Sequence, residues 1–142
     1  MSDAFDHNRA ILCHFDSYSA LLLFARFGSS LLLPEPAPEA ATGAVQASPT
    51  ELHDPARVRN ALVERYGLTE SELLHLPQFE AWLDGTPAPL RVHLFRVKSF
   101  SPPAELIERH EGKWKPVSEL RGIFPHELGY ARRIFELIMG GG

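Results

Sequence analysis

Cysteine and long apolar runs are scarce in this chain of 142 residues. Its one cysteine, Cys13, excludes an intramolecular disulfide and a thiolate metal cluster, which suits a reducing compartment. The longest apolar runs, residues 20–25 and 31–33, are too short to cross a bilayer. The polar and acidic residues 1–9 do not resemble a signal peptide either. We therefore expect a cytoplasmic protein that has no membrane partner.

Motifs of several common enzyme classes are missing as well. The histidines include no pair at His-x3-His spacing, which argues against a zinc site on a helix. No serine stands in a Gly-x-Ser-x-Gly setting, and the sequence contains no glycine-rich phosphate loop. The sequence therefore gives no support to a zinc enzyme, a serine hydrolase or a P-loop protein.

Charge is unevenly distributed along the chain, whose net charge is −4. Residues 1–85 carry 5 Lys and Arg against 12 Asp and Glu, whereas residues 86–142 carry 9 against 6. A mildly basic second half suits an anionic ligand, although a solvated mixed surface explains the same charges. The excess is too small to predict nucleic-acid binding, which requires a strong basic surface.

The first third of the sequence has the pattern of strands. Residues 9–15, 18–27 and 30–33 are nearly continuous apolar segments, as expected of strands that are buried on both faces. Gly28 lies between the second and third segments and suits a hairpin turn. The Pro- and Ala-rich residues 34–49 break all periodicity, so we expect a flexible loop within one domain.

A helix is expected to begin at Asp54-Pro55 and to end at Gly67. Asp caps free N–H groups, Pro is tolerated at the first helical position, and Gly adopts the left-handed conformation that stops a helix. The core-facing side of this helix should hold Val58, Leu62 and Tyr66. A capping-box pattern that starts at Thr69 predicts a further helical turn over residues 70–75.

The second half repeats the order of strands followed by a helix. Strands are predicted over residues 78–83, 90–100 and 113–115, and a final helix over residues 125–139. The core-facing stripe of that helix is expected to hold Leu128, Ala131, Phe135 and Ile138, with Ile134 alongside. This order predicts a single layered domain of the α/β or α+β class built on a mixed sheet.

Residues 60–68, Asn-Ala-Leu-Val-Glu-Arg-Tyr-Gly-Leu, resemble the second half of the Nudix (MutT-like) signature, G-x5-E-x7-R-E-U-x-E-E-x-G-U, in which U is aliphatic. Residues 114–120, Trp-Lys-Pro-Val-Ser-Glu-Leu, are similar to the segment that precedes the last helix of that superfamily. The resemblance implies an α/β/α sandwich over residues 1–142. It also implies hydrolysis of nucleoside diphosphate derivatives with Mg²⁺ or Mn²⁺. The matching positions are Leu62, Glu64, Gly67 and Leu68.

Most acids of the signature are absent, so the resemblance implies a degenerate Nudix box. Asn60 replaces the arginine, and Ala61 and Arg65 replace two of the glutamates. In the first half of the motif, Leu52 and Gln46 replace the glutamate and the glycine. Hard divalent cations need several oxygen ligands, so the usual hydrolysis is doubtful and no cofactor is expected by default.

Glu64 is the one candidate catalytic residue that the resemblance leaves. If the protein is an active hydrolase, Glu64 and Glu51 would ligate Mg²⁺ or Mn²⁺. A surface role, with Arg57 or Arg59 as the partner of Glu64 on the same helix, is the simpler interpretation of Glu64.

Ligand-binding candidates outside the box are Trp82, Arg91 and His93. Trp82 should lie on the sheet face opposite Phe79, from which it could stack on a base. Arg91 and His93 share one face of a predicted strand and could contact an anion. Core packing for Trp82 and internal hydrogen bonding for His93 are the simpler alternatives.

Three functional hypotheses remain open. The first is a non-hydrolytic nucleotide-binding or regulatory module, which would take a nucleotide-type small molecule. The second is a divergent Nudix hydrolase with a Mg²⁺ or Mn²⁺ site rebuilt from Glu64 and acids such as Glu51 or Glu108. The third is a protein-interaction domain, possible as a homodimer through the apolar strands.

Overall fold

The computed structural model describes residues 3–38, 47–84 and 88–140. These residues form one sheet of six strands in the order β3-β5-β1-β2-β6, with β4 paired to β5. The strands are β1 (Asn8–Asp16), β2 (Leu21–Phe27), β3 (Leu73–His75), β4 (Ala81–Leu83), β5 (Leu90–Val97) and β6 (Gly112–Pro116). The α-helices in the same ranges are α1 (Pro55–Tyr66), α2 (Ala104–Glu108) and α3 (Pro125–Phe135). β1 and β5 are parallel and the other pairs antiparallel, which confirms the predicted α/β class with a mixed sheet.

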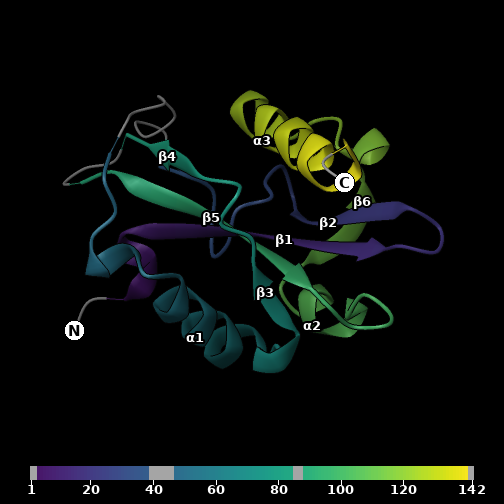
Figure 1. The fold of residues 1–142 in the computed structure, drawn as a ribbon, viewed down its shortest axis with the longest axis horizontal. Helices are drawn as coiled ribbons and strands as arrows, with labels where there is room; N and C mark the ends of the chain where they lie inside the picture. Colours follow the sequence, from purple (N-terminus) through teal and green to yellow (C-terminus); the bar gives the residue numbers. More distant parts are fainter. Residues whose placement is uncertain (1–2, 39–46, 85–87, 141–142) are drawn as a thin grey trace.

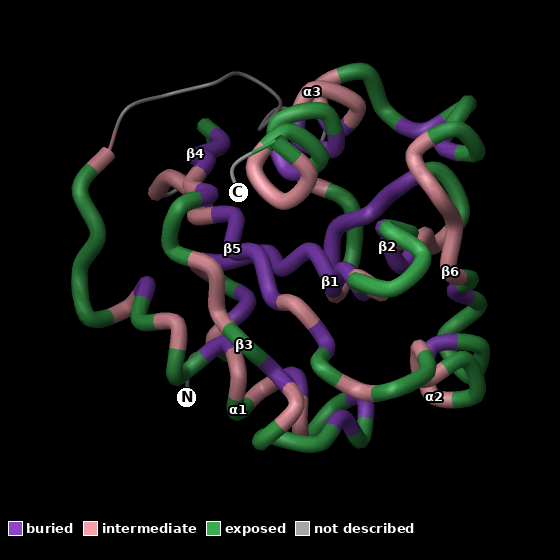
Figure 2. Tube along the Cα trace, turned by 45° about the vertical axis from the view of Figure 1, so that its right-hand side comes forward, coloured by how far each residue is buried: buried purple, intermediate pink, exposed green. Residues whose placement is uncertain are grey.

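Helices cover both faces of the sheet. In Figure 1, α1 and α2 lie below the strands and α3 lies above them. The buried side chains divide in the same way, because Ile11 and Cys13 of β1 pack on the α3 side and Ala10 and Leu12 on the α1 side. β1 is therefore buried on both faces, as predicted. Figure 2 shows β1 and β5 as buried segments in the middle of the fold.

Local sequence signals set both ends of α1. Asp54 Oδ1 accepts a hydrogen bond from the Ala56 N–H at 2.9 Å, and Pro55 occupies the first helical position. Gly67 ends the helix in the left-handed conformation with a φ of 72°. The predicted helix is confirmed, and its buried residues are those expected: Val58, Leu62 and Tyr66.

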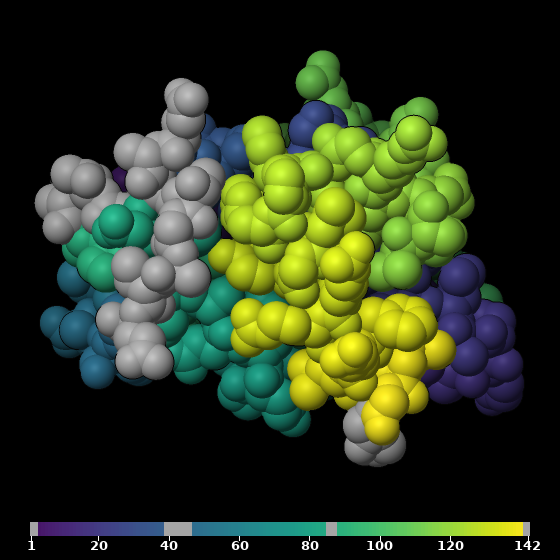
Figure 3. Space-filling model, turned by 90° about the horizontal axis from the view of Figure 1, so that it is seen from above, coloured from purple at the N-terminus to yellow at the C-terminus, as the bar shows by residue number. Residues whose placement is uncertain are grey.

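The predicted core stripe of α3 is partly wrong. Seen from above, α3 and the π-helical turn that follows it (Glu136–Gly140) spread across one face of the molecule (Figure 3). Phe135 is 39% exposed, whereas the carboxylate of Glu127 is fully buried. Glu127 accepts hydrogen bonds from the Ser30 hydroxyl and the Leu31 N–H, which rotates the buried side of the helix toward Glu127. The buried residues are Glu127, Tyr130, Ala131 and Ile134.

Residues 30–33 were predicted as a strand, but within the described chain they form only isolated bridges, such as that between Leu33 and Ala10. The Leu31 N–H donates to the Glu127 side chain and the Leu32 N–H donates to the Ser30 side chain, so neither group can form the backbone hydrogen bonds of a sheet. The hairpin turn that precedes them is confirmed, since Gly28 has a φ of 64° and Phe27 pairs with Ser30.

The helical turn predicted over residues 70–75 is only partly present, because the second half of this segment is a strand. Only Glu70–Glu72 form a 3-10 turn, and Leu73–His75 form β3 on the edge of β5. The Thr69 side chain makes no cap hydrogen bond within the described chain. Pairing with β5 outweighs a weak local helix signal, because a strand edge offers unpaired backbone groups.

The structure describes only part of the predicted loop at residues 34–49. Residues 34–38 and 47–50 belong to no helix or strand of the described chain, and residues 39–46 lie outside it. The predicted turn at residues 84–87 likewise has only its first residue inside the described ranges. No helix in those ranges is both long enough and apolar enough to span a bilayer.

Candidate functional site on the outer side of helix α1

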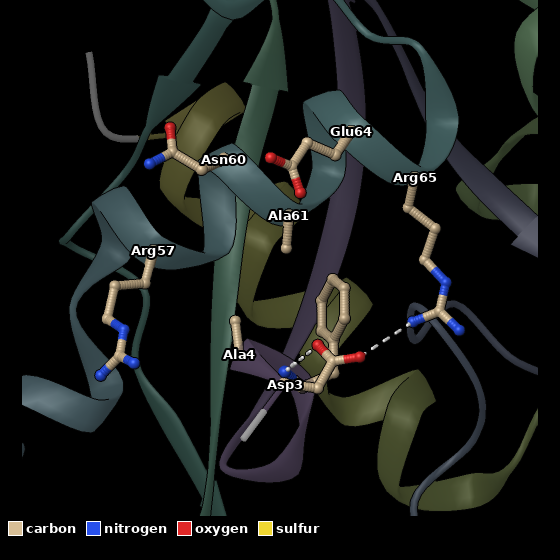
Figure 4. A pocket seen from close by; sticks show the side chains of 8 residues that line it. Asp3, Ala4, Arg57, Asn60, Ala61, Glu64 and Arg65 are labelled. Carbon is tan, nitrogen blue, oxygen red and sulfur yellow. Dashed lines mark hydrogen bonds and ion pairs between the residues drawn. The ribbon is translucent and has the colours of Figure 1, made fainter. Parts of the chain in front are cut away.

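The outward side of α1 and the N-terminal turn form an open pocket of about 540 Å³. Its helical residues recur at spacings of three and four, so they share one side of α1, next to the stripe that holds the buried Val58 and Leu62. Arg57 and Arg65 stand at opposite ends of the pocket, with Glu64 between them (Figure 4). The lining residues are Asp3, Ala4, Phe5, Arg57, Asn60, Ala61, Glu64 and Arg65.

A 3-10 turn at the N-terminus, Ala4–Asp6, forms the second wall. Reciprocal capping closes it, because Asp3 Oδ1 accepts from the Phe5 N–H and Asp6 Oδ2 accepts from the Asp3 N–H, both at 3.0 Å. The Phe5 ring is buried in the core cluster on the α1 side of the sheet. This anchor fixes the turn beside the helix.

The two guanidinium groups of the pocket are only loosely held. Arg65 Nη1 lies 3.7 Å from Asp3 Oδ2, and its guanidinium carbon lies 5.7 Å from the centre of the Phe5 ring. Arg57 Nη1 donates to the Glu51 carbonyl at 3.4 Å, near the limit for a hydrogen bond. Both side chains therefore keep donor capacity for an incoming anion.

Glu64 is exposed, and among the described residues it has no ion-pair partner within 4.0 Å. The predicted pairing with Arg57 or Arg59 is therefore wrong. Together with Asp3, Glu64 places two carboxylates in a pocket that also holds two guanidinium groups. The pocket is mixed in charge and open to water.

The acids proposed for a metal site lie apart from this pocket. Glu51 belongs to the 3-10 turn Glu51–His53, and Glu108 ends α2; neither lines the pocket that holds Glu64. Within the described ranges, no group of three His, Cys, Asp or Glu side chains is placed to hold a metal ion. Ala61 and Arg65 occupy positions where the resemblance would require acids.

Trp82, Arg91 and His93 lie elsewhere, on β4 and β5, and their polar groups contact other parts of the protein. Arg91 Nη2 lies 3.5 Å from Glu80 Oε2, and Arg91 Nη1 donates to the His53 carbonyl at 3.1 Å. Trp82 Nε1 donates to Glu80 Oε1 at 2.6 Å, and the indole is only 7% exposed. None of the three lines the α1 pocket.

His93 is buried in a network centred on Asn8. The Asn8 side-chain amide donates to the carbonyls of Ala4 and Leu52, so its oxygen accepts from His93 Nε2 at 2.7 Å. Burial, with the nearby positive charge of Arg91, lowers the pKa of His93 to about 3. His93 is therefore neutral at physiological pH and braces the segment that carries Ala4 of the pocket wall.

Sequence reasoning gave no ligand-binding role to Arg57 or Asp3, the two charged residues that join Glu64 and Arg65 in the pocket. Arg57 lies two turns before Glu64, so the spacing along α1 could have identified it. Asp3 carries no local signal, because its place opposite Arg65 depends on how the N-terminal turn packs in three dimensions.

Comparison with models of protein families yields no match, and no curated protein matches the chain.

Proposed function

We propose that the protein is a Nudix-like module that binds an anionic, nucleotide-type ligand on the outer side of α1 without hydrolysing it. One observation carries the proposal: the positions that the resemblance assigns to the arginine and the acids in the second half of the signature line one pocket. They here hold Asn60, Ala61, Glu64 and Arg65. Arg57 adds a second guanidinium to the same pocket.

The layered arrangement supports the Nudix-like interpretation. The chain has a mixed sheet with helices on both faces, and the helix that resembles the signature packs its apolar side on the sheet. A sheet with helices on both faces is consistent with the α/β/α sandwich that the resemblance implies.

Charge favours binding over hydrolysis. Guanidinium groups bind phosphate oxygens in pairs of parallel hydrogen bonds, which suits Arg57 and Arg65 as ligand-binding residues. A cation at position 65 repels Mg²⁺, and a lone carboxylate between guanidinium groups is a poor ligand set for a hard cation. Glu64 can instead accept hydrogen bonds from the hydroxyl groups of a sugar.

A second candidate is the divergent hydrolase. Asp3 lines the same pocket as Glu64, so two carboxylates face it. If a ligand phosphate supplied further oxygens, these two side chains would hold Mg²⁺ or Mn²⁺ and the metal would activate water.

Calorimetry with ADP-ribose, a dinucleoside polyphosphate and ATP tests the proposal. Each ligand is titrated once in EDTA and once in Mg²⁺, and the products are analysed by chromatography. We expect binding in EDTA, no turnover, and an affinity about tenfold lower for Arg57→Gln, since hydrogen bonds to charged groups contribute about 1.5–3 kcal/mol. Arg132→Gln, an exposed arginine on α3, is the matched control and should bind like the wild type.

Metal-dependent turnover that disappears in Glu64→Gln would establish the hydrolase instead. If no member of the panel binds in either buffer, both candidate functions are wrong.

A further inference from the structure

Asp3 places a carboxylate of the chain itself on the guanidinium of Arg65 (Figure 4). We propose that Asp3 is a tethered internal anion that occupies Arg65 until a ligand anion displaces it. This inference rests on the proposed function and adds a means of regulating the same pocket.

The anchor of the N-terminal turn begins after Asp3. Phe5 is buried, its carbonyl accepts from Arg9 Nη1 at 2.7 Å, and the Ala4 carbonyl accepts from the Asn8 side chain at 2.7 Å. The Asp3 side chain is 53% exposed and accepts a hydrogen bond from the nearby Phe5 N–H, whereas the Asp3 backbone N–H donates to Asp6 Oδ2. Asp3 can therefore leave Arg65 while the buried part of the turn stays in place.

The contact between Asp3 and Arg65 is weak enough to be exchanged. Both side chains are about half exposed and their closest charged atoms are 3.7 Å apart, so water and salt screen the attraction. A phosphate or pyrophosphate group carries more charge and offers several acceptor oxygens, so it forms the stronger pair with a guanidinium.

Phe5 keeps the guanidinium in place during the exchange. The Arg65 guanidinium lies over the Phe5 ring at 5.7 Å, and this contact does not involve Asp3. Arg65 therefore stays oriented toward the pocket when its partner changes from a carboxylate to a ligand anion.

Asp3→Asn is the direct test, because asparagine keeps the side-chain oxygen that caps Phe5 and removes the charge. Affinity for ADP-ribose and for inorganic pyrophosphate is measured by calorimetry in EDTA at low ionic strength. We expect Asp3→Asn to bind about two- to fivefold more tightly than the wild type, the range for an exposed ion pair. Asp6→Asn makes the same charge change in the same turn and should have a smaller effect.

A double-mutant cycle separates displacement from a general charge effect. In an Arg65→Gln background, Asp3→Asn should no longer improve binding, since the internal pair is already gone. An equal gain in that background, or no gain in the wild-type background, overturns the inference and leaves the proposed function standing. If the ligands bind to Asp3→Asn but not to the wild type, the inference is supported. If they bind to neither protein, both the inference and the proposed function are overturned.

Hydrogen exchange supplies a second measurement. When Asp3 leaves Arg65, its capping of the turn weakens, so ligand should increase amide exchange at Phe5 of the wild-type protein while α1 becomes more protected. Uniform protection of the turn and the helix on ligand binding would contradict displacement of Asp3.

Discussion

Arg65 and Arg91 make the same two kinds of contact in different surroundings. Arg65 lies 3.7 Å from a carboxylate and 5.7 Å from a Phe ring, and Arg91 lies 3.5 Å from a carboxylate and 5.9 Å from a Trp ring. The Arg65 side chain is 49% exposed and that of Arg91 is 13% exposed. Because exclusion of water strengthens charge interactions, Arg91 serves the framework of the protein, whereas Arg65 remains available to a ligand.

The asparagines of the two regions differ in the same way. Asn8 is fully buried and bonds to two backbone carbonyls and to His93, whereas Asn60 is an exposed residue of the α1 pocket. A polar residue in a motif is therefore informative about ligand binding only when its hydrogen-bonding groups are not already used inside the fold.

The largest effect should come from Asn8→Ala. This change leaves two carbonyls and the His93 Nε2–H without their partner in a buried region, so we expect a loss of about 3 kcal/mol in the free energy of unfolding. Urea denaturation measures it. Asn60→Ala is the matched control and should be neutral or slightly stabilising on an exposed helix. Equal losses in the two variants would break the distinction between the regions.

The second-largest effect should be a loss of stability in acid, which arises from the buried His93. The pKa of His93 in the folded state, about 3, lies below its unfolded value near 6.5, so folding disfavours the proton. The contribution of neutral His93 to the free energy of unfolding is complete above about pH 6.5. It falls by about 1.4 kcal/mol per pH unit as the pH drops, and it stops falling below about pH 3. Between pH 6.5 and 5 this amounts to about 2 kcal/mol, measured by urea denaturation at each pH.

His93→Gln should show a correspondingly shallower loss of stability over the same range, since glutamine can donate to Asn8 and does not titrate. Equal slopes for His93→Gln and the wild type would contradict the assignment of a neutral, buried His93.

The smallest effects are expected for the two arginines. Arg91→Gln loses the contact with Glu80 and the bond to the His53 carbonyl, so we expect about 1.5 kcal/mol of destabilisation. Arg65→Gln should change the unfolding free energy by less than about 0.5 kcal/mol, and it should weaken binding of the proposed ligand. A stability loss in Arg65→Gln as large as in Arg91→Gln would show that both arginines are structural.

Sequence reasoning worked where neighbouring residues decide the structure. Asp54, Pro55 and Gly67 set the ends of α1, and the spacing of Val58 and Leu62 identified its buried side. The faces of α3 were misjudged because Glu127 is buried by bonds to Ser30 and Leu31, almost a hundred residues away along the chain. Residues 73–75 became a strand because β5 offered an edge.

The residues of the candidate site could likewise be predicted only in part. Glu64 and the altered box around it were visible in the sequence, and the structure places Asn60, Ala61 and Arg65 beside it in one pocket. Trp82, Arg91 and His93 were predicted from residue type and strand alternation. Neither could reveal that Glu80, His53 and Asn8 already use their polar groups.

The sequence by itself determined the α/β class, the limits of α1 and the small number of acids on its outer side, because caps, spacing and residue identity act over a few neighbouring positions. Only the tertiary structure decided which polar groups stay free. The partners of Arg65, Arg91 and His93 lie on other elements of the fold, and contact and exclusion of water arise only when those elements pack together.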